Sequence, residues 1–279
     1  MELFIKSSDL GDFLKVAKVL DAMDNAPIGV FDSGSGGLSV WGGLVRGLPH
    51  ESAIYYGEGK HCPFGDRTQE QIIEYTDLAV RRLLEQGVKL IVIACNAATA
   101  MAIDHLRAAY DVPFVGLEPA VKPAVERTKS GVVGVLATAA TLRGRHFRDT
   151  SAKYADRVEI VTAVGEGFVE LVEGNREDSV EAVKVVRRAL EPLLDAGADH
   201  IVLGCTHYPF LAHTMQKVIG NRRVELIDPS IAIVKRVGTL LREHDNEASP
   251  DNKPFYEFMT SAGEDYRQKL TEKSKSLNL

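Results

Sequence analysis

Two apolar runs that each end in a cysteine constrain this chain more than any other feature. Residues 89–95 read Lys-Leu-Ile-Val-Ile-Ala-Cys, and residues 200–205 read His-Ile-Val-Leu-Gly-Cys. A run rich in β-branched residues that stops at a small residue is typical of a buried parallel strand whose carboxyl end reaches a cleft. Small polar residues follow both cysteines. We therefore expect Cys95 and Cys205, one from each half of the chain, to face a single site.

Strand-like and helix-like segments alternate along the chain, which predicts a parallel α/β architecture. The expected strands are residues 27–33, 53–57, 88–95, 112–117, 131–137, 158–163, 199–205 and 223–228. The expected helices are residues 68–86, 97–110 and 177–196, and Thr68 with Glu70 and Gln71 gives the first of them an N-terminal signal.

The two halves of the chain repeat three features in the same order. Residues 27–34 resemble residues 131–138, the cysteine runs match each other, and the acid-Pro turn in residues 115–120 resembles that in residues 226–230. The alternative interpretation is that parallel strands simply look alike. We expect two similar α/β domains with mainly parallel central sheets, related by pseudo-twofold duplication, with the active site in the cleft between them.

The acid-Pro turns also predict where the domains begin and end. Residues 1–26 form an N-terminal extension with the pattern of a short amphipathic helix. The first α/β domain comprises residues 27–118 and 229–279, and the second comprises residues 119–228. We expect the polar tail after residue 263 to form a surface helix or a frayed end.

Composition excludes several classes of protein. No stretch approaches the ~18 apolar residues of a membrane span, and the amino terminus lacks the apolar core of a secretory signal, so we expect a cytoplasmic protein with no membrane partner. Three cysteines without a CxxC motif or zinc-type spacing predict neither a disulfide framework nor a metal site. A formal charge of −6 gives no basic footprint for nucleic acid.

The loop Asp-Ser-Gly-Ser-Gly-Gly at residues 32–37 directly follows an expected strand. Its small residues allow backbone N–H groups to face an anion. It fits neither the Walker A motif nor the dinucleotide fingerprint, and Asp32 would repel a phosphate. A site for a carboxylate or an amine is favoured, with Asp32 meeting an ammonium or acting as a base and Ser33 donating. A tight turn without a ligand is the alternative.

The two cysteines suit proton transfer. A thiol has a pKa of about 8.5, close enough to neutrality for its surroundings to select thiol or thiolate. Two such groups on opposite faces of one carbon allow a proton to leave one face while another arrives at the opposite face, which is the chemistry of racemisation or epimerisation. His207, two residues past Cys205, is placed to tune its proton. Cys62, in a Gly- and Pro-rich loop, has no counterpart in the other half, and we interpret it as structural.

With these residues assembled, the chain resembles the glutamate racemases, cofactor-independent isomerases that supply D-glutamate for bacterial peptidoglycan. The resemblance covers residues 27–230. It depends on four motifs in order: Asp-Ser-Gly-x-Gly-Gly at 32–37, Cys-Pro-Phe-Gly at 62–65, Cys-Asn at 95–96 and Gly-Cys-Thr-His at 204–207. It implies no pyridoxal phosphate or other cofactor.

The resemblance also implies roles for individual residues. Cys95 and Cys205 are the catalytic acid/base pair, each serving one enantiomer. Asp32 assists Cys95, and His207 assists Cys205 together with an acid from residues 168–173, for which Glu173 is favoured over Glu170. The substrate-binding residues are Asp32, Ser33, Phe64, Gly65, Asn96, Ala97, Thr206 and His207.

The chain departs from the family pattern at two places. Position 97 is alanine where the family usually has threonine, so a backbone N–H or the nearby Thr99 would have to replace the hydroxyl. Glu58 and His61 are unusual in a loop that covers the site. The extension resembles those of racemases regulated by a cell-wall precursor, which makes such an effector a candidate partner, and a homodimer is a candidate assembly.

Three other functions remain open from the sequence. An aspartate or hydantoin racemase of the same superfamily would prefer a different substrate. A small-molecule sensor would bind an amino acid without exchanging its Cα proton. A nucleotide-binding protein would use the glycine loop, and the intact cysteine pair weighs against the last two.

Overall fold

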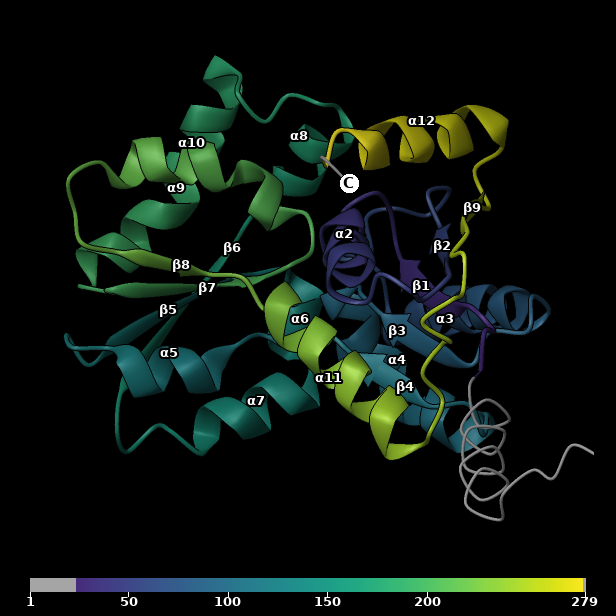
Figure 1. Cartoon of the computed structure of the whole chain (residues 1–279). Helices are drawn as coiled ribbons and strands as arrows, with labels where there is room; N and C mark the ends of the chain where they lie inside the picture. Colours follow the sequence, from purple (N-terminus) through teal and green to yellow (C-terminus); the bar gives the residue numbers. More distant parts are fainter. Residues whose placement is uncertain (1–23, 278–279) are drawn as a thin grey trace, which may run out of the picture.

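The computed structural model describes residues 24–277 and contains two sheets, each flanked by helices (Figure 1). The first sheet has the strand order β4-β3-β1-β2-β9, and every pairing in it is parallel. Its strands are β1 (Ile28–Asp32), β2 (Ala53–Gly57), β3 (Leu90–Ile93), β4 (Phe114–Gly116) and β9 (Tyr256–Thr260).

Helices cover both faces of this first sheet. They are α2 (Leu38–Gly47), α3 (Gln69–Leu84), α4 (Asn96–Ala109), α11 (Ser230–Glu243) and α12 (Glu264–Lys275). Alternate strand residues point to opposite faces: Ile91 and Ile93 of β3 pack with α3 and α4, whereas Leu90 and Val92 pack with α2 and α11. Because both faces are buried, the central strands β1 and β3 are apolar along almost their whole length.

The second sheet has the order β6-β5-β7-β8 and is also entirely parallel. Its strands are β5 (Val132–Ala137), β6 (Glu159–Val164), β7 (His200–Gly204) and β8 (Glu225–Ile227). The helices around it are α5 (Val121–Arg127), α6 (Ala139–Arg143), α7 (Arg145–Ala152), α8 (Phe168–Glu173), α9 (Val180–Asp195), the 3₁₀ helix η1 (Tyr208–Leu211) and α10 (Ala212–Ile219).

The two sheets share one topology. The order β4-β3-β1-β2 in the first sheet matches β8-β7-β5-β6 in the second, strand for strand along the chain. The predicted fold class, two similar α/β halves with parallel sheets, is therefore confirmed. β9 has no counterpart in the second sheet and pairs with β2 at the edge of the first. The sequence did not predict this strand, whereas all eight duplicated strands were predicted.

Two predictions concern the ends of the chain. The amphipathic helix expected in the N-terminal extension falls on residues 1–23, which lie outside the described part. The tail after residue 263 forms helix α12, and its Leu270 is completely buried. The frayed end considered from the sequence is therefore wrong, because α12 packs on β9 and α2.

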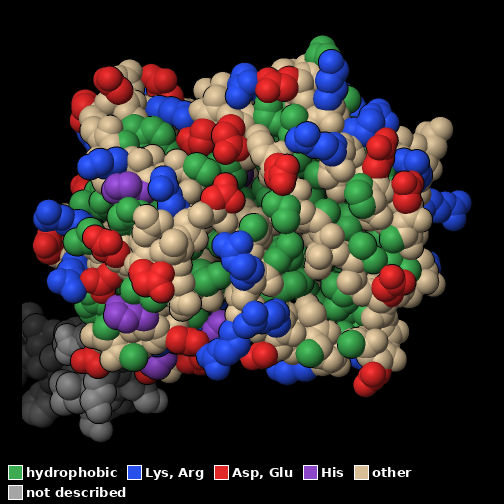
Figure 2. Space-filling model, turned by 180° about the vertical axis from the view of Figure 1, so that it is seen from behind, with side chains coloured by type: hydrophobic (Ala, Val, Ile, Leu, Met, Phe, Trp, Pro, Cys, Tyr) green, Lys and Arg blue, Asp and Glu red, His purple; other side chains and the backbone are tan. Residues whose placement is uncertain are grey.

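The surface carries mixed charge. Figure 2 shows acidic and basic side chains interspersed with hydrophobic ones over the face opposite to that of Figure 1. Since the chain has a formal charge of −6, an anionic ligand would be held by local donors and not by the overall field. Within residues 24–277, no helix is both long and apolar enough to cross a membrane.

Candidate active site

The carboxyl ends of β1, β3 and β7 bring the predicted residues together. Asp32 ends β1, Cys95 follows its neighbour β3, and Cys205 follows β7 of the other sheet. The Thr206 hydroxyl, next to Cys205, donates a hydrogen bond of 3.1 Å to the Asp32 carboxylate. The ends of the two sheets therefore meet at Asp32, and the expectation that both cysteines face one site agrees with this arrangement.

Cys95 caps the amino end of α4. Its Sγ accepts the Ala98 N–H at 3.4 Å and donates to the Ser33 hydroxyl at 3.6 Å. The thiol is buried, and this burial, reinforced by the Asp32 carboxylate, raises the pKa of Cys95 to about 12. Without a ligand, Cys95 is therefore a thiol, and a cation placed beside it would favour the thiolate.

Asp32 is completely buried yet well supplied with donors. Besides Thr206, the Gly34 N–H donates to its carboxylate at 3.0 Å. Burial raises the pKa of Asp32, and the nearby His207 opposes this rise. The carboxylate is placed to hold a cationic group of a ligand close to Cys95.

Cys205 begins a chain of polar contacts. Its Sγ lies 3.9 Å from Nδ1 of His207, and Nε2 of His207 lies 2.8 Å from Oε1 of Glu173. Burial would lower the pKa of His207, but hydrogen bonds with the Cys205 and Cys62 thiols and with Glu173 raise it well above its usual value. Glu173 shows the converse: burial would raise its pKa, but His207 and Lys269 hold it well below its usual range. An imidazolium paired with a carboxylate therefore stands beside the second thiol.

Close contacts explain the glycines of the 32–37 loop. A Cβ atom on Gly36 would lie 2.3 Å from Nδ1 of His207, and one on Gly34 would lie 2.5 Å from Oε1 of Glu173. A Cβ atom on Gly37 would lie 2.6 Å from Cβ of Asp32. The motif is thus required by the packing of the loop against the polar residues of the site.

The alternative role considered for Thr99 is wrong. Its hydroxyl donates to Ile93 O at 3.1 Å and accepts from Leu117 N–H at 3.0 Å, so it links β3 to the segment after β4. Ala97 is buried in the first turn of α4, where backbone N–H groups lack partners within the helix. Asn96 donates from Nδ2 to Leu117 O, and its buried Oδ1 has no hydrogen-bond partner among the described residues.

The loop that contains Phe64 and Gly65 spans the two halves. Phe64 packs against Phe31 with a ring-centroid distance of 6.2 Å, and Gly65 O accepts the Ala140 N–H of α6 at 3.1 Å. Glu58 at the start of this loop is buried, and the Ser261 hydroxyl donates to it. His61 stacks on Tyr75 at 3.9 Å. The two unusual residues thus anchor the loop to its surroundings.

Three contacts at this site have no signal in the sequence. Cys62 lies close to His207 and Glu173, so that one sulfur, nitrogen or oxygen atom from each of the three falls within 4.8 Å of the others. Tyr266 and Lys269 of α12 both donate to Glu173. The polar tail in which they lie gives no motif that would mark them.

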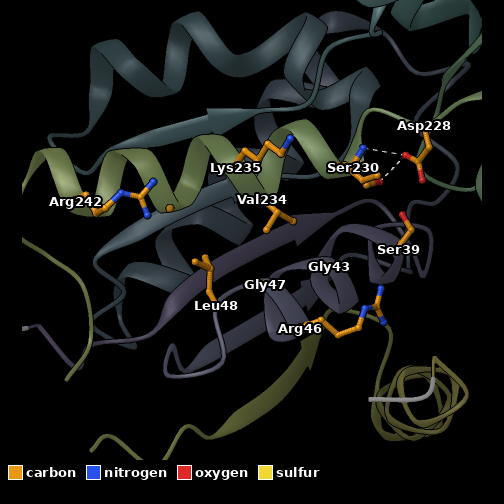
Figure 3. Close-up of a pocket in the computed structure, with 12 residues that line it drawn as sticks. Ser39, Gly43, Arg46, Gly47, Leu48, Asp228, Ser230, Val234, Lys235 and Arg242 are labelled. Atoms are coloured by element: carbon orange, nitrogen blue, oxygen red, sulfur yellow. Dashed lines mark hydrogen bonds between the residues drawn. The ribbon is translucent and has the colours of Figure 1, made fainter. Parts of the chain in front are cut away.

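Two cavities are relevant to ligand binding, and only the smaller one borders these residues. One of about 230 Å³ is lined by Cys62, Glu170, Glu173, Tyr266, Lys269 and neighbouring residues. Another of about 590 Å³ lies between α2 and α11 (Figure 3). Arg46, Lys235 and Arg242 border it, together with Asp228, whose carboxylate accepts from Ser230. Neither Cys95 nor Cys205 lines either cavity.

Residues 34–237 match the family model for Asp/Glu/hydantoin racemases. The chain belongs to this family. It is 45% identical to the glutamate racemase of Herpetosiphon aurantiacus over 239 residues, which covers 86% of this chain and 94% of that protein. The glutamate racemase of Deinococcus radiodurans is 48% identical over 217 residues, covering 77% and 74%. The resemblance drawn from the four sequence motifs is thereby confirmed.

Solved structures of this racemase family have the same fold. A glutamate racemase isoform of Bacillus anthracis superposes with a TM-score of 0.82 at 29% identity, over 91% of this chain and 95% of that one. The Escherichia coli glutamate racemase, solved with L-glutamate and the activator UDP-MurNAc-Ala, has a TM-score of 0.79 at 30% identity over 90% and 95%. The protein is thus an isomerase of the racemase class.

Proposed function

We propose that this protein interconverts L- and D-glutamate without a cofactor and so supplies D-glutamate for peptidoglycan. The observation that carries the proposal is the pair of strand-end thiols, each with its own polar partners at one site: Asp32 near Cys95, and His207 with Glu173 beside Cys205. The identities to glutamate racemases over most of the chain support glutamate as the substrate.

The reaction needs one thiolate and one thiol. The thiolate of one cysteine removes the Cα proton, and the thiol of the other delivers a proton to the opposite face. The first cysteine ends as a thiol and the second as a thiolate, so no atom or charge is lost. The opposite enantiomer reacts with the two roles exchanged. The imidazolium of His207 stabilises a thiolate on Cys205.

The substrate would supply the charge that Cys95 lacks. Its ammonium group, held by the buried Asp32 carboxylate, would lower the pKa of the Cys95 thiol. Backbone N–H groups in the first turn of α4, including that of Ala97, would bind a carboxylate with the helix dipole behind them. The missing hydroxyl at position 97 then removes one donor and leaves the main-chain donor in place. The proposed binding residues are Asp32, Ser33, Phe64, Gly65, Asn96, Ala97, Thr206 and His207.

Circular dichroism of each glutamate enantiomer in deuterated water tests this proposal. The protein should racemise both enantiomers and place deuterium at Cα. Replacing either thiol by a hydroxyl, in Cys95→Ser or Cys205→Ser, should slow racemisation by about 10³-fold or more, since a hydroxyl is a far weaker acid. Wild-type rates in both variants would refute the two-thiol mechanism, and faster turnover of aspartate than of glutamate would refute the substrate.

We further propose that a UDP-linked cell-wall precursor regulates the enzyme. The E. coli relative was solved with such an activator, and the cations around the cavity in Figure 3 would suit its diphosphate. Added UDP-MurNAc-Ala should change the racemisation rate of the parent protein but not of Lys235→Glu with Arg242→Glu. Equal responses would refute this cavity as the effector site.

The domain limits and the assembly are also proposals. We propose that residues 27–118 and 229–279 form one domain and residues 119–228 the other, which the pairing of β9 with β2 supports. A homodimer in the cytoplasm is the proposed assembly, and sedimentation equilibrium of the purified chain distinguishes it from a monomer.

A further inference from the structure

Helix α12 contacts the short helix α8 through three side chains. The Tyr266 hydroxyl donates to Oε2 of Glu173 at 3.0 Å. Lys269 donates to the same oxygen at 2.9 Å and also to the main-chain oxygen of Glu173 at 2.6 Å. Lys273 donates to Val172 O at 3.0 Å. Two lysines therefore satisfy carbonyl groups at the carboxyl end of α8, where the helix dipole favours cations.

These contacts fix both oxygens of the Glu173 carboxylate. Oε1 faces His207 and the Ser35 N–H, whereas Oε2 faces Tyr266 and Lys269. With donors on both sides, the carboxylate cannot rotate without losing hydrogen bonds, and each of them is charge-assisted. The side chain of Glu173 is only 18% exposed, so water replaces a lost donor poorly.

We propose that Tyr266 and Lys269 are positioning residues that hold Glu173 against His207, so that helix α12 controls proton transfer at Cys205 and not at Cys95. This inference rests on the proposed two-thiol reaction. Neither residue contacts a catalytic thiol; each acts through Glu173 and then His207. Burial and the Glu173 carboxylate raise the pKa of Tyr266, so its hydroxyl remains a donor.

The contacts between α12 and α8 also connect the two proposed domains. Helix α12 follows β9 of the first sheet, whereas α8 lies between β6 and β7 of the second. The polar chain behind Cys205 is therefore complete only when α12 rests on α8. Cys95 has no such dependence, because its contacts come from Ser33 and from its own helix α4.

Primary isotope effects on each enantiomer separate the two proton transfers. We would compare Lys269→Met and Tyr266→Phe with Lys275→Met, an exposed lysine on the same helix. Loss of either donor would let Glu173 and His207 shift, and an ångström-scale displacement at a reacting group costs on the order of 10²-fold in activity. With Cα-deuterated substrate, the isotope effect on kcat/KM should rise for one enantiomer and fall for the other, in the same direction as in His207→Asn. Lys269→Arg should restore most of the rate.

The isotope effects decide whether α12 acts on Cys205 alone. Isotope effects that stay as in Lys275→Met, or that change equally for both enantiomers, would overturn the inference. Tyr266→Phe removes a single hydroxyl and keeps the test available if Lys269→Met does not fold, which far-ultraviolet circular dichroism would show. If the parent protein fails to racemise glutamate, the proposed function has failed. If the parent racemises and only the isotope pattern is absent, the α12 inference alone has failed.

Discussion

Single glycines in the 32–37 loop allow its main chain to pack directly against His207, Glu173 and Asp32. Gly36 is the most sensitive, because an added Cβ would overlap the imidazole ring that stands between Cys205 and Glu173. The ring is buried and paired on both sides, so it has no free space into which to move. The position of His207 beside Cys205 therefore depends on residue 36 having no side chain.

We expect Gly36→Ala to reduce racemisation by roughly 10²-fold, which is the effect of an ångström-scale displacement of a reacting group. Gly42→Ala is the matched control. Gly42 lies within α2, and its Cβ would meet only flexible side-chain ends, the nearest being Leu277 Cδ1 at 3.2 Å. The control should keep its activity and gain slightly in helix stability. Full activity in Gly36→Ala would show that His207 tolerates displacement.

Among the elements, a buried ion pair joins the starts of β2 and β3, and the segment before β9 binds to both of its members through main-chain groups. Lys89 lies 2.7 Å from Glu51, and their side chains are 2% and 7% exposed. Lys89 also donates to Asn246 O at 2.7 Å, and Glu51 accepts the Ala248 N–H at 2.8 Å. These contacts fix residues 246–248, which lead the chain from α11 into β9 of the first sheet.

Lys89→Met should therefore destabilise the protein by about 3–5 kcal/mol, because it leaves the Glu51 charge buried without a partner. The double variant Lys89→Met with Glu51→Gln should recover part of that loss. Urea unfolding followed by circular dichroism measures both. A single variant within about 1 kcal/mol of the parent would mean that water compensates the Glu51 carboxylate once Lys89 is removed.

The sequence predicted the eight duplicated strands because each lies in a largely apolar run that alternates with a helical segment. β9 lacked that pattern, since Tyr256–Thr260 is a partly exposed edge strand whose second residue is the exposed Glu257. Its partner β2 lies about two hundred residues earlier, so no local pattern links them. Tyr266 and Lys269 were missed for the same reason: their partner Glu173 is distant in sequence, and a polar helix shows no sign of its contacts.

The central residues of the site could be predicted from the sequence better than the residues that hold them in place. Asp32, Cys95, Cys205 and His207 stand at strand ends, where the chain order alone places them near one another. The choice of Glu173 over Glu170 stays a prediction, with the 2.8 Å contact to His207 in its favour. Cys62 stays interpreted as structural, although it contacts the same imidazole.

Across the whole molecule, polar contacts at the site hold the two sheets together. Thr206 to Asp32, Ser35 to Glu173 and Lys269 to Glu173 all join a residue of one half to a residue of the other. Because Glu173 and His207 both have shifted pKa values, the stability that they contribute depends on pH. Glu173 sets the acidic limit of the pH range in which this contribution is complete, and His207 sets the alkaline limit.

The pKa of Glu173 is lowered by folding, so its contribution is complete above its unfolded value of about 4.3 and is lost as pH falls toward the folded value. The pKa of His207 is raised, so its contribution is complete below about 6.5 and is lost as pH rises toward the folded value. The two contributions are therefore both complete only between these values.

Urea unfolding of the parent, Glu173→Gln and His207→Asn across pH 3–9 tests this window. The free-energy difference between the parent and Glu173→Gln should be largest near pH 5–6 and smaller at pH 3, because at pH 3 Glu173 is protonated in the unfolded chain but still ionised in the folded protein. The difference for His207→Asn should shrink toward pH 9 instead, because the imidazole is then neutral in the unfolded chain, whereas the folded protein must still bind the proton. Differences that do not vary with pH would mean that the pair stabilises the two halves by packing and not by charge.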